Sequence, residues 1–182
     1  IILHMNTPCK KYADSARQTA KAEGATLAYY SANANRFASS TVDVEFSSMQ
    51  ARFTSLLSPG ASILDFGCGS GRDAKAFADA GFTVTAIDGC PELCALASEL
   101  SGLEVRCQLF EDFDEVDTYD GIWACSSILH LPKSQLLEVM ATSPVDSRQR
   151  RALYLLQARG VRGDAQRQAL HRLHGRNVLR FH

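Results

Sequence analysis

Three alternating glycines, Gly67, Gly69 and Gly71, follow a short apolar run that ends in an acid, Asp65. Glycine takes positive φ without strain and, having no Cβ, lets the backbone approach a ligand closely. A glycine loop between a strand and a helix typically holds the polar part of a nucleotide. The spacing is G-x-G-x-G rather than the G-x-G-x-x-G of dinucleotide-binding folds, which disfavours an NAD-dependent oxidoreductase.

A second acid follows at a distance that suits the same kind of ligand. Residues 82–88 alternate in polarity and end in Asp88. An acid about 20 residues beyond the glycine loop, at the tip of the second strand, can accept both ribose hydroxyls of an adenosine. The alternative is that Asp88 only precedes the helix that Pro91 opens.

Alternating strands and helices must position these residues. Periodicity and glycine stops predict helices over residues 72–80 and 91–102 and from Pro132 to Met140. Strands are expected to end at Asp65 and to span residues 82–88, 103–109 and 121–125. This order predicts an α/β fold with a Rossmann-like, doubly wound parallel sheet.

These motifs together resemble the class I S-adenosylmethionine (SAM) methyltransferases. Residues 63–71 are similar to the first motif of that family, and residues 84–88 to the second. Residues 119–130 resemble the strand-four segment of a bacterial branch often labelled tellurite-resistance-type. Residues 26–30 and 37–41 are similar to the lead-in of that branch, so the resemblance runs from about residue 26 to residue 140.

The resemblance implies a methyltransferase (EC 2.1.1.-) that uses SAM, releases S-adenosylhomocysteine (SAH), and methylates a small molecule by in-line displacement. His130, just past strand four, is the candidate catalytic residue, as a base or an orienting group. The implied cofactor-binding residues are Tyr30, Asp65, Gly67, Cys68, Gly69, Gly71, Arg72, Asp88, Gly89, Cys90, Phe110, Glu111, Asp112, Cys125 and Ser126. No metal site is expected.

Several roles stay open at this stage. His130 fits a helix start or a packing position equally well. Arg72 either pairs with the SAM carboxylate or sits on a helix surface. Glu111 and Asp112 are both candidates for the adenine amino group. Tyr29 and Tyr30 belong either to a lid over SAM or to the core.

The charge distribution changes abruptly near the end of the chain. Residues 1–146 carry a net charge of −9, whereas residues 147–182 hold nine arginines and one acid, a net of +8. A basic arm for nucleic acid is one interpretation. The preferred one is a shifted reading frame after Met140. Back-translated residues 157–164 and 169–181, read one nucleotide later, give sequences similar to the missing family segments, in order.

Three segments follow from this interpretation. Residues 1–25 are an N-terminal extension, of which residues 1–4 resemble a remnant of an expression vector. Residues 26–140 are the SAM-binding core, and residues 141–182 are the atypical, arginine-rich tail. The sheet is therefore expected to stop after strand four or five, with residues 152–156 as a surrogate fifth strand. An open sheet edge would permit dimerisation.

Composition narrows the class of protein. A chain of 182 residues suffices for one domain with a substantial core. No apolar stretch reaches the 18 or so residues of a membrane span. Six cysteines without a Cys-x-x-Cys pair favour free thiols and a cytoplasmic location. The rival functions are a SAM- or nucleotide-binding module without turnover, and a nucleic-acid binder acting through the tail.

Overall fold

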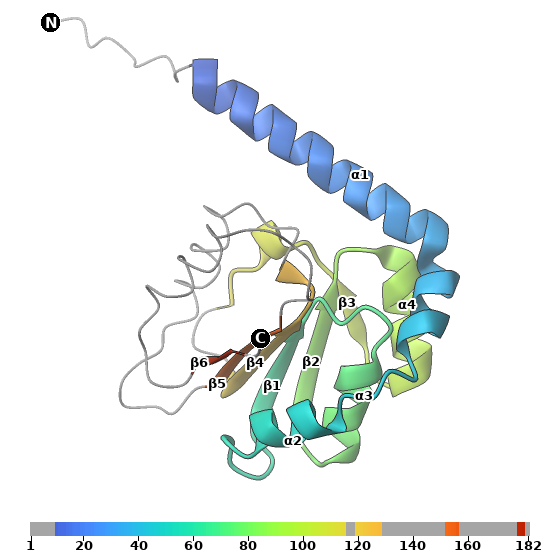
Figure 1. Cartoon of the computed structure of the whole chain (residues 1–182), viewed down its shortest axis with the longest axis vertical. Coiled ribbons are helices and arrows are strands. Elements are labelled where there is room, and N and C mark those ends of the chain that lie inside the picture. The colour runs from blue at the N-terminus through green and yellow to red at the C-terminus, as the bar shows by residue number, and fades with distance from the viewer. Residues whose placement is uncertain (1–9, 116–118, 129–151, 157–177, 181–182) are drawn as a thin grey trace, which may run out of the picture.

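The computed structural model describes residues 10–115, 119–128, 152–156 and 178–180. Six strands form one sheet in the order β3-β2-β1-β4-β5-β6, and all five pairs are parallel (Figure 1). The strands are β1 (Ser62–Phe66), β2 (Thr83–Asp88), β3 (Val105–Cys107), β4 (Gly121–Cys125), β5 (Ala152–Leu156) and β6 (Val178–Arg180). The predicted parallel α/β architecture is confirmed.

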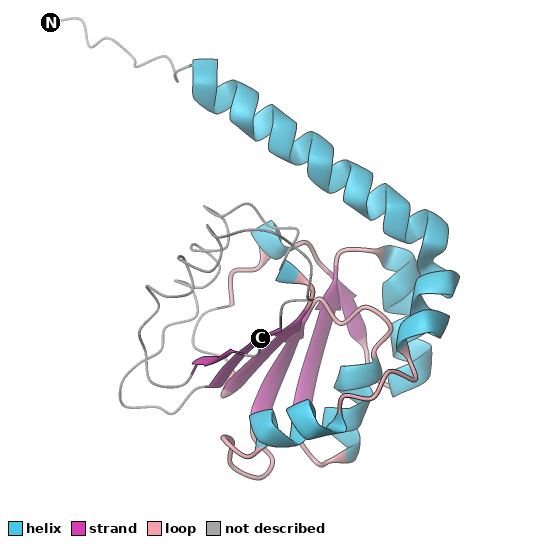
Figure 2. Cartoon of the chain, viewed as in Figure 1, coloured by secondary structure: helices cyan, strands magenta, loops and turns pink. Residues whose placement is uncertain are grey.

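The helices α2, α3 and α4 are grouped beside one face of the sheet (Figure 2). The helices are α1 (Lys10–Thr41), α2 (Ser47–Thr54), α3 (Arg72–Asp79) and α4 (Pro91–Ser101), and a 3₁₀ turn, η1, spans Phe110–Asp112. Proline at the first position opens α4, and Gly102, with φ of 73°, ends it. The predicted spans of α3 and α4 are therefore correct to within one residue.

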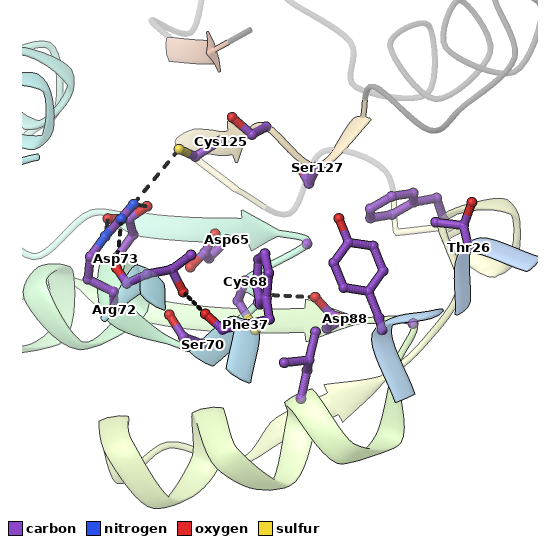
Figure 3. Close-up of a pocket in the computed structure, with 18 of the residues that line it drawn as sticks. Thr26, Phe37, Asp65, Cys68, Ser70, Arg72, Asp73, Asp88, Cys125 and Ser127 are labelled. Carbon is purple, nitrogen blue, oxygen red and sulfur yellow. Dashed lines mark hydrogen bonds and ion pairs between the residues drawn. The ribbon is translucent and has the colours of Figure 1, made fainter. Parts of the chain in front are cut away.

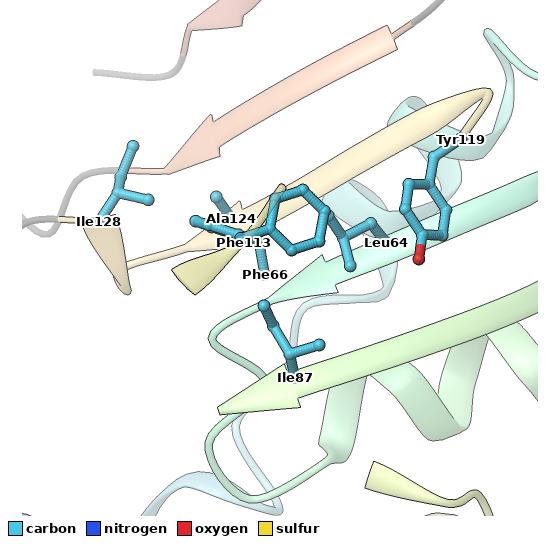
Figure 4. Close-up of a cluster of buried hydrophobic side chains, with 7 residues drawn as sticks. All are labelled: Leu64, Phe66, Ile87, Phe113, Tyr119, Ala124 and Ile128. Atoms are coloured by element: carbon cyan, nitrogen blue, oxygen red, sulfur yellow. The ribbon is translucent and has the colours of Figure 1, made fainter. Parts of the chain in front are cut away.

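The core has two sides because successive residues of a strand point to opposite faces. Ile63 of β1 packs with Phe53, Phe77 and Trp123 on the side of α2 and α3. On the other side, Figure 4 shows a second cluster around β1, β2 and β4. Its members are Leu64, Phe66, Ile87, Phe113, Tyr119, Ala124 and Ile128.

The strand order reverses between β1 and β4, and this reversal creates the crevice in which such folds bind ligands. β1 pairs with β2 on one side and with β4 on the other. The backbone N–H groups of Gly67 and Cys68 both donate to the carbonyl of Ile87, at 3.0 and 2.9 Å. The glycine loop is thereby tied to the tip of β2.

The end of the sheet differs in one respect from expectation. Residues 152–156 form β5 beside β4, as expected for a surrogate fifth strand. The sheet does not stop there, since Val178–Arg180 adds β6 in parallel to the open edge of β5. That edge presents unpaired backbone groups, which a further strand satisfies. The expected helix over residues 132–140 lies outside the described residues.

The long N-terminal helix α1 is one of two α-helices that the sequence did not predict, the other being α2. The first part of α1 extends away from the sheet, and its last part crosses beside α4 (Figure 1). There, Leu27, Tyr30 and Phe37 pack against a cluster of Ala34, Cys90 and Leu93. This contact places one face of α1 above the carboxyl ends of β1 and β2.

Candidate active site

A cavity of about 350 Å³ lies at the carboxyl ends of β1, β2 and β4, beneath the last turns of α1. Figure 3 shows side chains from all of these elements directed into it. Residues that line it are Thr26, Leu27, Tyr30, Phe37, Thr41, Val44, Phe46, Asp65, Gly67, Cys68, Gly69, Ser70, Arg72, Asp73, Asp88, Gly89, Leu93, Leu109, Phe110, Glu111, Cys125, Ser126 and Ser127. Twelve of the predicted site residues are among them.

Two glycines are required at the cavity because a side chain would not fit. Gly67 has φ of 83°, and a Cβ there would collide with the side chains of Ser127 and Phe110. Gly69 has φ of 55°, and its Cβ would come within 3.2 Å of the Phe37 ring. The loop backbone therefore faces the cavity directly, as predicted.

Gly71 has a structural role at the start of α3. It does not line the cavity but caps the start of α3 with φ of 80°. A Cβ at this position would lie 2.8 Å from Cα of Ala97 in α4. Gly71 is therefore needed for the close approach of α3 to α4, and its assignment to the cofactor stays a prediction.

The Asp88 carboxylate stands at the tip of β2 and is held by the backbone. Its Oδ2 accepts from the Gly69 N–H at 2.9 Å, and its Oδ1 accepts from the Cys90 N–H at 2.9 Å. Burial raises the pKa of Asp88, while backbone hydrogen bonds oppose that shift. Each oxygen keeps acceptor capacity for a ligand hydroxyl.

Cys90 donates a backbone hydrogen bond to the Asp88 carboxylate but does not line the cavity. Its side chain is buried between α1 and α4 and its thiol contacts Glu92 at 3.3 Å. The predicted contact between Cys90 and the cofactor stays a prediction.

Asp65 is a buried acid with an incomplete set of partners. It is only 1% exposed, and within the described residues its Oδ2 accepts no hydrogen bond. Burial, followed by the charges of Asp73 and Asp88, raises the pKa of Asp65 well above its usual range, while the charge of Arg72 and a backbone hydrogen bond from Ala74 oppose that shift. A cationic group placed in the cavity would relieve this cost.

Arg72 forms one wall of the cavity rather than lying on the helix surface. Its side chain is 17% exposed and makes a two-point ion pair with Asp73, with Nε–Oδ1 and Nη2–Oδ2 distances of 2.8 Å. Nη1 donates to the carbonyl of Thr41 at 3.2 Å. The guanidinium also lies 4.2 Å from the centre of the Phe46 ring. The open alternative of a surface arginine is thus excluded.

The end of the cavity away from Arg72 is lined by apolar side chains and one acid. Phe110 stacks on Phe66 with ring centres 4.4 Å apart, and Leu109 and Glu111 stand beside it. Asp112 is exposed outside the cavity, so of the two acids only Glu111 lines it. A flat ring between Phe110 and an acid is the arrangement expected for adenine.

The end of β4 closes the floor of the cavity. Ser126 has φ of 58°, a left-handed conformation that non-glycine residues seldom adopt and that is often found at functional sites. Burial raises the pKa of the neighbouring Cys125 thiol to about 12, so this thiol is neutral and a poor nucleophile. The candidate catalytic residue His130 lies outside the described residues.

The position of α1 distinguishes the two tyrosines, Tyr29 and Tyr30, whose roles the sequence left open. Tyr30 lines the cavity and meets Phe37 edge to face, with ring centres 5.1 Å apart. Tyr29 is 63% exposed and points elsewhere. Sequence reasoning missed Leu27 and Phe37, although the spacing of Leu27, Tyr30, Ala34 and Phe37 follows one face of a helix.

The strand order and the cavity at the switch point define a nucleotide-binding α/β domain. Residues 63–143 match a family model described as a methyltransferase domain. Residues 63–143 are therefore similar to methyltransferase domains over 81 of the chain's 182 residues.

Two curated relatives carry the same name. The chain is 38% identical over 81 residues to a ubiquinone biosynthesis O-methyltransferase of Xanthomonas campestris pv. campestris, covering 41% of this chain and 34% of that protein. With the protein of that name from Xylella fastidiosa it shares 40% identity over 81 residues, covering 40% of this chain and 32% of that protein. The chain thus spans about a third of the length of the curated relatives it matches.

A solved structure supports the fold. The SAM complex of magnesium protoporphyrin IX methyltransferase from Synechocystis PCC 6803 aligns with a TM-score of 0.54 at 17% identity. The alignment covers 66% of this chain and 69% of that one. In the described part of this chain, none of the helices has the length and apolar character needed to span a membrane.

Proposed function

We propose that this protein is a SAM-dependent methyltransferase that acts on a small-molecule acceptor. The observation that carries the proposal is the pair of acids on one cavity: Asp88 at the tip of β2 and the buried Asp65 beside the glycine loop. SAM carries a pair of ribose hydroxyls and an ammonium group, and these acids suit those two groups respectively.

The remaining residues fit the same ligand. Gly67 and Gly69 leave room for it at the loop, because a side chain at either position would fill the space. Phe110 and Glu111 would hold the adenine, and Arg72 would pair with the carboxylate of the donor. The donor would therefore extend from Phe110, past Asp88 and Asp65, to Arg72.

The chain contributes positioning and exclusion of water. When bound, SAM supplies an electrophilic methyl group on its sulfonium, so the acceptor needs alignment more than activation. Tyr30 and Phe37 would cover the donor from α1. His130 is proposed to orient the acceptor or to take its proton. The likeness of residues 119–130 to the tellurite-resistance-type branch remains part of this proposal.

A second candidate is a SAM-binding module without turnover. It is favoured by the arginine-rich sequence of residues 147–182, where the methyltransferase family closes the acceptor side. Nucleic-acid binding through those arginines would instead show as salt-dependent affinity that is lost when residues 147–182 are deleted.

Calorimetric titration tests the proposal. SAM and SAH should bind with one site per chain, and NADH should not. Asp88→Ala should weaken SAM binding by about 1–3 kcal/mol, because two hydroxyls lose their acceptors. Transfer of a labelled methyl group to candidate phenols, thiols and oxyanions then separates the enzyme from the module without turnover.

A further inference from the structure

Asp73 joins three elements at the wall of the cavity. The residue is 5% exposed. Its Oδ1 accepts from Gln50 Nε2 of α2 at 2.7 Å, and its Oδ2 accepts from Trp123 Nε1 of β4 at 2.9 Å. The Arg72 guanidinium supplies two further bonds at 2.8 Å. One carboxylate therefore fixes the positions of α2, α3 and β4 relative to one another.

The same carboxylate determines where the Arg72 guanidinium lies. A two-point pair holds the plane of the group, since both oxygens of Asp73 are used. Thr41 O and the Phe46 ring restrain the other edge and one face. Within the described residues these bonds and the long contact to Cys125 Sγ, at 3.9 Å, account for four of the five N–H groups. One Nη1 hydrogen remains, and Arg72 lines the cavity.

The position of the Arg72 guanidinium along the cavity suits the carboxylate of the methyl donor. Figure 3 shows Arg72 and Asp73 at one end and Asp88 toward the other, with Asp65 between them. A donor whose ribose lies on Asp88 and whose ammonium lies at Asp65 brings its carboxylate toward Arg72. Long arginine side chains otherwise sample many rotamers, so holding the group in advance favours binding.

We infer that Asp73 is a positioning residue, which holds Arg72 ready for the carboxylate of the methyl donor. This inference rests on the proposed function, and it concerns a residue whose two carboxylate oxygens both accept from the Arg72 guanidinium. The gain is specific to the carboxylate, because adenine and ribose bind at the far end of the cavity.

The test compares two ligands that differ only in the carboxylate: SAM and decarboxylated SAM. Affinities are measured by calorimetry for the wild type, Arg72→Ala, Asp73→Asn and Trp123→Phe. The matched control is Asp79→Asn, which breaks an exposed ion pair with Lys75 on the same helix, α3. Trp123 is the chain's single tryptophan, so its emission reports whether the Asp73 network persists in Asp73→Asn and Asp79→Asn.

Asp73→Asn should weaken SAM binding about tenfold or more and leave decarboxylated SAM within about twofold, as Arg72→Ala should, since tenfold corresponds to about 1.4 kcal/mol. Trp123→Phe removes one bond of four and should give the same selectivity at smaller size, which keeps the test valid if Asp73→Asn does not fold. Equal losses for both ligands would overturn the inference and leave the proposed function standing. A wild type that binds neither ligand would overturn the proposed function itself.

Discussion

At the scale of single residues, Asp65 is the clearest sign that the site is built for a cationic ligand. A carboxylate that is 1% exposed, close to Asp73 and Asp88 and short of one hydrogen-bond partner, costs stability in the free protein. A protein would retain such a group where a bound ligand offsets the cost. The unpaired oxygen therefore argues for an ammonium in the cavity.

The raised pKa of Asp65 predicts that its contribution to the stability of the folded protein is lost as pH rises. The folded-state pKa of Asp65 lies above its unfolded value, so its contribution is fully present below pH 3.8 and is lost as pH rises through the raised pKa. Asp65→Asn should remove that loss and be more stable by about 1–3 kcal/mol at alkaline pH. Denaturant unfolding of both proteins between pH 5 and about 9 measures it. If the unfolding free energies of the two proteins ran parallel across that pH range, the buried Asp65 carboxylate would not destabilise the folded protein.

The same protonation makes donor binding pH-dependent in the opposite sense. SAM should bind more tightly as pH rises, since its ammonium prefers the Asp65 carboxylate to the acid. Calorimetry in two buffers of different ionisation enthalpy should show proton release with the wild type and none with Asp65→Asn. A binding enthalpy that is the same in both buffers would contradict this prediction.

Several of the predicted residues that line the cavity have a local signal in the sequence. Asp65, Gly67, Gly69 and Asp88 sit at strand tips that periodicity and glycine spacing define. Asp73 could not be found this way, because its partners Gln50 and Trp123 lie 23 and 50 residues away in sequence. Only the packing of α2, α3 and β4 brings them together.

At the scale of elements, the close approach of α3 and α4 depends on one glycine. Gly71→Ala places a Cβ 2.8 Å from the backbone of Ala97 at positive φ. Overpacking and conformational strain together should cost about 2–4 kcal/mol. Gly81→Ala is the matched control, since Gly81 has φ of 86° and open space around it. Equal thermal shifts for the two variants would mean that helix packing does not require Gly71.

A second prediction at this scale concerns the edge of β4. Ending the chain at Asp146 removes β5 and β6 and leaves β4 unpaired on one side. Exposed edges pair with other chains, so this variant should form oligomers or aggregates that light scattering detects. A chain ending at Arg176 keeps β5 and should stay closer to the full-length protein. A monodisperse chain 1–146 would show that β5 is dispensable.

Strand and helix spans near the site were predictable because glycine, proline and alternation mark their ends. The long α1 was not, since its first half has few apolar residues and its last half was read only as a lead-in by family resemblance. The tertiary contact of α1 with α4 places the end of α1 over the cavity.

At the scale of the whole molecule, the shifted reading frame proposed for the arginine-rich tail is a prediction about the gene and not about the fold. If the frame shifts after Met140, restoring it should raise methyl transfer by orders of magnitude, because transition-state stabilisation needs the acceptor wall. SAM affinity should change much less, since the donor-binding residues precede Met140. Equal turnover by the two chains, on an acceptor that both use, would show that residues 141–182 are an evolved part of the enzyme.

The most direct test of the account is a crystal structure of the chain with SAH. We expect SAH to bind with its ribose hydroxyls on the Asp88 carboxylate, its adenine beside Phe110 and Glu111, its ammonium at Asp65 and its carboxylate facing Arg72. SAH bound elsewhere, or lying in this cavity with its ends reversed, would contradict the assignment of the site and the function built on it.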